Sequence, residues 1–237
     1  MARTQLASVQ RLLKYKISPE RFDSESSALL EAGFTSNQAE ALIIRQTSSN
    51  TVKAVLTSCK TLLAQPYALT HQQIINIASH DGGSKNIEAV QAAFEALTRL
   101  GFNADQVVKI VSHHGGSKNI QAVQAAFEAL TRLGFNADQV VKIVGHDGGA
   151  KNIEAVQAAF EALTRLGFNA DQVVKIVGHD GGSKNIEAVQ AAFEQLTRLG
   201  FNADQVVKIV GHGGGSKNIE AMQAAFEPLT RLGFNAD

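Results

Sequence analysis

The sequence predicts an all-α fold, a right-handed α-solenoid superhelix of 33-residue helix-turn-helix repeats. Two observations support this prediction. A Phe-Asn-Ala-Asp segment recurs every 33 residues, beginning at Phe102, Phe135, Phe168, Phe201 and Phe234. Each copy also has a His, a variable residue and a Gly-Gly pair between two segments whose apolar residues follow helical spacing. Neither helix of such a unit can bury its apolar face alone, so neighbouring copies must stack.

The repeats divide the chain into an N-terminal capping region of degenerate repeats, residues 1–68, and a repeat array, residues 69–237. The predicted units of the array are 69–101, 102–134, 135–167, 168–200 and 201–233, with a partial copy at 234–237. Residues 34–68 form a degenerate unit, with Arg45 where the turn would begin. A terminal repeat has to cover the end of the core, which explains its departure from the pattern.

The unit 135–167 shows how each helix is specified. Asn136 is expected to N-cap a short apolar helix, with Gln139 completing a capping box. Gly145 then provides a helix C-terminal signal. After the turn, apolar residues over 153–163 recur at spacings of three and four and predict a longer helix with one buried face, which Gly167 ends.

Composition excludes several classes of protein. The net charge is zero, so a nucleic-acid partner is not indicated by bulk charge. No apolar run reaches the roughly 20 residues that span a bilayer, and no secretory signal is visible. The single Cys59 excludes an internal disulfide framework and fits a reducing intracellular compartment, with packing as its expected role.

The second residue of each turn differs between otherwise similar copies. In order, these residues are Asp81, His114, Asp147, Asp180 and Gly213. The residue before each is a histidine, namely His80, His113, His146, His179 and His212. One interpretation makes the Asp an N-cap of the long helix and the His a ring that ties the turn to a backbone carbonyl. The other makes the variable residue one contact per repeat with a linear polymer, because His114 is a poor cap in an unchanged turn.

A lysine follows each glycine pair in the first turn of the long helix. Glycine amides at a helix N-terminus are natural phosphate sites, and a lysine adds a positive charge. An exposed ion pair, as between Lys151 and Glu154, is the alternative. The phosphate-binding candidates are Gly82, Gly83, Lys85, Gly115, Gly116, Lys118, Gly148, Gly149, Lys151, Gly181, Gly182, Lys184, Gly214, Gly215 and Lys217.

The segment Gln-Val-Val-x-Ile-x-x-His-Asp-Gly-Gly, as at residues 139–149, resembles the DNA-binding repeats of bacterial transcription activator-like (TAL) effectors over residues 69–237. In that family each repeat follows the major groove of double-stranded DNA and reads one base through the second variable residue, while the first steadies the loop. The resemblance implies loop-stabilising roles for the five histidines. It also implies base reading by Asp81, His114, Asp147, Asp180 and Gly213.

The implied target strand is 5′-C-G-C-C-T-3′, with guanine or any base at the second position. Each Asp would accept a hydrogen bond from the N4 amine of a cytosine. Gly213 would leave room for a thymine methyl group, and His114 would donate to a guanine. The chain departs from the family in having no Trp, so Arg45 is expected to bind a phosphate without a strong base preference. Ser-Lys or Ala-Lys also stands where the family usually has Lys-Gln.

The expected partner is double-stranded DNA, with no membrane, small-molecule substrate, cofactor, metal ion or catalytic activity. The resemblance suggests a bacterial protein that acts on DNA as a transcriptional regulator or effector, with a host nucleus as one place of action. The protein is expected to be a monomer. Three alternatives remain: a protein-binding α-solenoid of the HEAT or armadillo type, an RNA reader, and a metal or enzyme site at His113-His114. The last is disfavoured because the histidines recur one repeat apart instead of converging.

Overall fold

A computed structural model describes residues 14–44, 48–80, 82–113, 115–146, 148–179, 181–212 and 214–233, except the side chains of Phe226 and Leu229. These residues form thirteen helices and contain no strand, which confirms the predicted all-α repeat solenoid. No helix among them has the length and apolar character needed to cross a membrane. The helices form two compact units, residues 1–112 and 113–237.

The first unit contains the degenerate region and the first regular repeat. Its helices are α2 (Pro19–Glu31), α3 (Ser36–Ile44), α4 (Ser49–Leu63), α5 (His71–Ala78), α6 (Ser84–Arg99) and α7 (Ala104–Val111). Long helix α4 packs against long helix α6, and short helix α5 packs against α7. The degenerate residues thus form the short and long helices of a repeat, and Pro19 lies at the start of α2.

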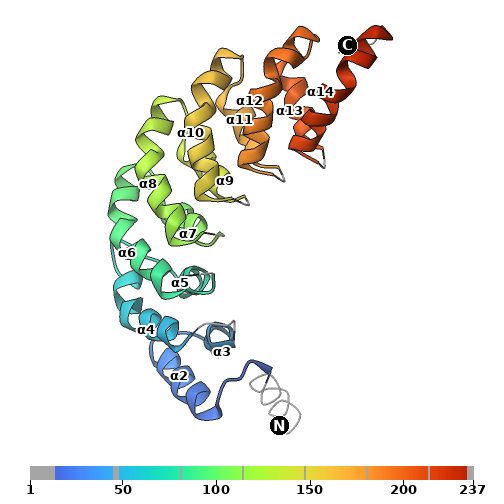
Figure 1. Ribbon diagram of the computed structural model, residues 1–237. Helices are drawn as coiled ribbons and strands as arrows, with labels where there is room; N and C mark the ends of the chain where they lie inside the picture. Colours follow the sequence, from blue (N-terminus) through green and yellow to red (C-terminus); the bar gives the residue numbers. More distant parts are fainter. Residues whose placement is uncertain are drawn as a thin grey trace. The chain divides into compact units, whose positions relative to one another are not determined.

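The second unit repeats one packing arrangement. Its helices are α8 (Ser117–Arg132), α9 (Ala137–Val144), α10 (Ala150–Arg165), α11 (Ala170–Val177), α12 (Ser183–Arg198), α13 (Ala203–Gly211) and α14 (Ser216–Arg231). The long helices pack side by side in chain order, and the short helices form a second layer against them (Figure 1). The loops that join α9 to α10, α11 to α12 and α13 to α14 lie at the same end of their helices.

The core of each repeat is aliphatic and aromatic. In the third regular repeat, Ile153, Val156 and Leu163 are buried, as their helical spacing predicts. Phe135 packs edge-on against Phe160 with ring centroids 4.7 Å apart, and Phe168 packs in the same way against Phe193 at 4.9 Å. These contacts place the four phenylalanines in the core of their repeats.

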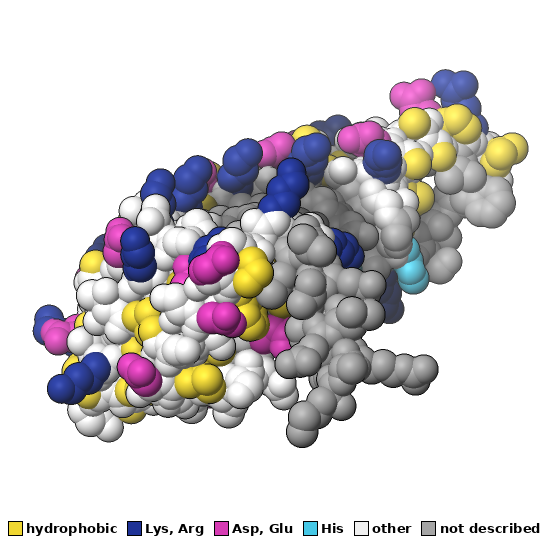
Figure 2. Space-filling model, turned by 90° about the horizontal axis from the view of Figure 1, so that it is seen from below, with side chains coloured by type: hydrophobic (Ala, Val, Ile, Leu, Met, Phe, Trp, Pro, Cys, Tyr) yellow, Lys and Arg dark blue, Asp and Glu magenta, His cyan; other side chains and the backbone are white. Residues whose placement is uncertain are grey.

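The outer end of the long helices carries exposed ion pairs. Arg165 lies 3.8 Å from Glu161, and the two side chains are 81% and 75% exposed. Figure 2 shows Lys and Arg side chains interspersed with Asp and Glu on the face in view. Exposed pairs of this kind contribute little to stability, so the fold depends on the core.

Cys59 is buried in α4, with its Sγ 3.9 Å from the carbonyl oxygen of Ala32. Burial raises the pKa of the thiol, because the thiolate would lose its hydration. The packing role predicted for this residue is confirmed.

The short helices begin as the sequence predicts. Asn136 N-caps α9, and Gln139 completes the capping box by accepting a hydrogen bond from the Asn136 amide at 2.9 Å. Asn169 and Gln172 form the same arrangement at the start of α11. These local bonds fix where each short helix starts, and therefore where the loop that follows it begins.

The contribution of the N-cap hydrogen bond to stability can be tested by substitution of Asn169. Replacing Asn169 with Ala removes the acceptor of the Gln172 amide, and we expect the free energy of unfolding to fall by about 1 kcal/mol. Replacing it with Ser keeps a capping oxygen and should cost only a few tenths of a kcal/mol. Urea denaturation followed by circular dichroism measures both. Equal losses for Ala and Ser would show that the cap contributes nothing.

Candidate functional site

The loop between the two helices of each repeat is built on its glycine pair. In the third regular repeat, Gly148 has φ +115° and Gly149 has φ +46°. The long helix begins at the next residue, so Gly149 holds the N-cap position and no side chain caps the helix. The interpretation of the turn Asp as N-cap is therefore wrong, since a glycine holds that position in the long helices α6, α8, α10 and α12.

The structure does not describe the variable residue of any loop. Asp81, His114, Asp147, Asp180 and Gly213 all lie outside the described residues, as do Arg45 and the partial copy at 234–237. Their assignment as base readers, and that of Arg45 as a phosphate contact, stay predictions. The described residues on both sides of each variable position still define the frame that holds it.

Most backbone amides around the glycine pair are already engaged. The Gly149 amide donates to the His146 carbonyl at 3.1 Å, and the Lys151 amide donates to the Gly148 carbonyl at 2.9 Å. The Ala150 amide donates to the side chain of Asn119, in the preceding repeat, at 3.0 Å. Gly148 is exposed whereas Gly149 is buried. A phosphate at this loop would therefore meet the first glycine and the lysine, while the second glycine shapes the backbone.

The lysines that follow the glycine pairs are all exposed. No ion pair to any of them, including one from Lys151 to Glu154, forms within the described residues. Each lies in the first turn of a helix, where the dipole favours an anion. Exposed lysines at helix N-termini are accessible to a negatively charged partner, and their role as phosphate contacts stays a prediction. The five residues are Lys85, Lys118, Lys151, Lys184 and Lys217.

Loop histidines in the second unit lie against the following repeat. A Cβ built on the facing glycine would lie 3.0 to 3.2 Å from the ring Nε2 in the pairs His113–Gly145, His146–Gly178 and His179–Gly211. Neither His146 nor His179 has a ring hydrogen bond within the described residues, so the expected bond to a carbonyl is not formed there. The ring instead fills the space above the end of the next short helix. Loop stabilisation by the histidines stays a prediction.

A buried asparagine lies beneath the first four of the five loops, and sequence reasoning missed it. Asn86, Asn119, Asn152 and Asn185 are fully buried. The Asn152 Nδ2 donates to the carbonyl of Ile143, in the short helix before the loop, at 3.1 Å. Its Oδ1 accepts a hydrogen bond from the Ser183 amide, just after the next glycine pair, at 3.0 Å. One side chain therefore connects two consecutive loops.

The sequence did carry a signal for this asparagine. It lies four residues before Val156 and so extends the buried stripe of the long helix by one turn. A polar residue at a core position requires hydrogen-bond partners. A stripe that starts at the apolar Ile153 omits its polar first member, Asn152.

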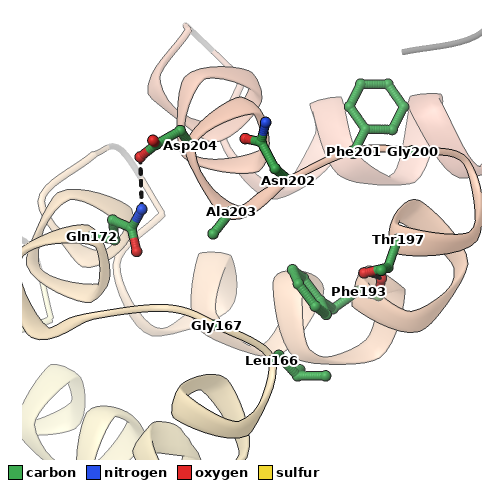
Figure 3. Close-up of a pocket in the computed structure, with 10 residues that line it drawn as sticks. All are labelled: Leu166, Gly167, Gln172, Phe193, Thr197, Gly200, Phe201, Asn202, Ala203 and Asp204. Atoms are coloured by element: carbon green, nitrogen blue, oxygen red, sulfur yellow. Dashed lines mark hydrogen bonds between the residues drawn. The ribbon is translucent and has the colours of Figure 1, made fainter. Parts of the chain in front are cut away.

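The opposite end of the repeats has a second polar link and a hollow. The Gln172 Nε2 donates to Asp204 Oδ1, in the next repeat, at 2.6 Å (Figure 3). The hollow beside this bond has a volume of about 510 Å³, and its lining includes Phe193, Thr197 and Leu166. No group of three or more His, Cys, Asp or Glu among the described residues could hold a metal ion. This polar link is separate from the glycine loop, where the residue that changes between copies lies.

Comparison with known proteins agrees with the loop geometry. Five consecutive TAL effector repeats match residues 47–80, 81–113, 114–146, 147–179 and 180–212. The first match begins inside the predicted N-terminal region, in the degenerate unit that contains α4. A comparison with curated proteins found no match. Since the matches cover residues 47–212 of 237 without a gap, the chain belongs to the TAL effector repeat family, a non-enzymatic family of DNA-binding repeat proteins.

Proposed function

We propose that this chain binds double-stranded DNA and reads one base per repeat in the major groove, with the target strand 5′-C-G-C-C-T-3′ and guanine or any base at the second position. One observation supports the proposal above all. Each repeat presents a His-x-Gly-Gly loop with an exposed first glycine and an exposed lysine, next to the position x whose residue changes between Asp, His and Gly. A constant frame around one variable residue suits a polymer with a constant backbone and variable bases.

In this proposal, different residues make the phosphate contacts and the base contacts. Lys85, Lys118, Lys151, Lys184 and Lys217, with the first glycine of each pair, contact phosphates and set the register of the protein on the duplex. Asp81, Asp147 and Asp180 accept hydrogen bonds from cytosine amines, His114 donates to a guanine, and Gly213 leaves space for a thymine methyl. The chain acts on DNA as a monomer without catalytic chemistry, as a transcriptional regulator or effector.

Links between loops favour a polymeric partner over a folded protein. In the second unit, Asn119, Asn152 and Asn185 each hold the amide that follows the next glycine pair, at 2.8 to 3.0 Å. Consecutive loops are therefore held at one repeated spacing, which a ligand with a regular repeat can match. A HEAT-type protein partner would need no such identical spacing.

The central test changes one base and one residue. Fluorescence anisotropy compares a duplex containing 5′-CGCCT-3′ with one in which the third base pair is replaced. We expect the replacement to cost about 1 to 3 kcal/mol, or roughly 5- to 150-fold in affinity, because Asp147 loses the cytosine amine. In the Asp147→Gly variant the same replacement should have little effect, while discrimination at the fourth base should persist through Asp180.

Each other outcome has a separate meaning. Equal affinity of the unchanged protein for all duplexes would reject base reading and show that the protein binds only the DNA backbone. Preference for single-stranded RNA over the duplex in a competition assay would show that the ligand is RNA. Failure to bind any nucleic acid, with the helical fold intact by circular dichroism, would favour the protein-binding solenoid.

A further inference from the structure

We propose that Asn152 and its counterparts Asn119 and Asn185 are positioning residues for base reading, each of which fixes the register between two consecutive loops. This inference rests on the proposed function. Its structural basis is independent of any base assignment, because it depends only on the described frame of the loops.

Two of the hydrogen bonds of Asn152 lie on opposite sides of the two loops that carry the variable residues. The Nδ2 group holds the Ile143 carbonyl, upstream of the third loop, at 3.1 Å. The Oδ1 atom holds the Ser183 amide, downstream of the fourth loop, at 3.0 Å. Because the side chain is fully buried, water cannot replace either partner without disrupting the core. A shift of one loop is therefore transmitted to the other through a single amide group.

Asn152 also packs directly against the loop backbone at Gly148. A Cβ built on Gly148 would lie only 2.5 Å from the Asn152 Oδ1. The backbone next to the variable position thus rests on the side-chain amide. Glycine at this position and asparagine below it depend on each other, and their spacing of four residues is the same in every regular repeat.

The same inter-repeat hydrogen bond occurs three times in the second unit. The Ala150 amide bonds to Asn119 at 3.0 Å, and the Ser216 amide bonds to Asn185 at 2.8 Å. In the degenerate unit the aligned position holds the buried Thr51, which has a shorter side chain. The asparagine therefore occurs in the repeats that have the His-x-Gly-Gly turn. The degenerate unit, which lacks this turn, has a threonine instead.

The inference predicts where base discrimination is lost. In Asn152→Leu, which is close in size but has no hydrogen-bonding group, we expect discrimination at the third and fourth bases to fall at least about fivefold. Discrimination at the first and fifth bases should be retained. Amide exchange of Ser183, followed by NMR in the DNA-free protein, should accelerate at least about tenfold because its acceptor is gone.

Two further variants separate positioning from stability. Val156→Ala also removes buried contacts from α10, one turn further on, and should lower the melting temperature while leaving the pattern of base discrimination unchanged. If Asn152→Leu does not fold, Asn152→Thr is measured instead, because Thr occupies the aligned position in the degenerate unit. Five duplexes, each with one base pair replaced, give the discrimination pattern for every variant.

The outcomes distinguish this inference from the proposed function. Equal binding of all five duplexes by the unchanged protein would reject one-base reading itself. If the unchanged protein discriminates, but the Asn152 variant keeps its discrimination at the third and fourth bases or loses it equally at all five, the positioning role is rejected. Unchanged exchange of the Ser183 amide would show that the inter-repeat bond does not form in solution.

Discussion

Replacing the five loop lysines with glutamine is expected to weaken DNA binding strongly without changing the preferred sequence. If each lysine neutralises one phosphate, the slope of log affinity against log salt should fall by about 4.5, since each contact contributes ~0.9. Between 50 and 200 mM salt, five such contacts account for an affinity change of about 500-fold. The substitutions are Lys85→Gln, Lys118→Gln, Lys151→Gln, Lys184→Gln and Lys217→Gln.

A matched charge control lies on the same helices. Arg165 is the last residue of α10 and Lys151 is the second, so the 14-residue interval between them spans about 20 Å of helix. That distance is about two Debye lengths at 0.1 M salt, so a charge there should not act on the loop. Changing Arg99, Arg132, Arg165, Arg198 and Arg231 to Gln alters the net charge equally. Similar salt slopes for the two variants would show that binding depends on overall charge and not on the loops.

Local patterns made the helices predictable. Asn136 and Gln139 are three residues apart, and the bonds between them form within one turn of chain. The buried stripe of α10 likewise depends on residues three and four apart. Such interactions need no knowledge of the partner repeat, and so the sequence alone placed the short helix, its end at Gly145 and the long helix.

Contacts between repeats were the part that sequence reading missed. The bond from the Ser183 amide to Asn152 joins residues 31 positions apart, and nothing near Asn152 in the sequence identifies its partner. The same holds for the bond between Gln172 and Asp204, since the capping box already accounted for the glutamine. The interpretation of the turn Asp as an N-cap failed because Asp is a common cap, whereas the turn requires positive φ at both glycines.

Replacing Gly148 with Ala is expected to destabilise the protein far more than replacing Gly167 with Ala. Both glycines have positive φ, +115° and +90°, where a side chain is strained. A Cβ on Gly167 meets no atom within 4 Å, so that change should cost only about 1 to 2 kcal/mol of backbone strain. A Cβ on Gly148 would also displace the buried Asn152, and we expect a loss of about 3 kcal/mol or more.

The pair of variants isolates the contact between loop and asparagine, because backbone strain is common to both. Urea denaturation gives the two free energies of unfolding, and DNA binding is then measured where both variants are folded. Equal destabilisation would mean that Asn152 moves aside at no cost, and would remove the physical link between the glycine pair and the next repeat. A larger loss for Gly148→Ala, with weaker discrimination at the third and fourth bases, would instead show why the turn retains this glycine. The backbone there must lie directly on the amide that holds the following loop.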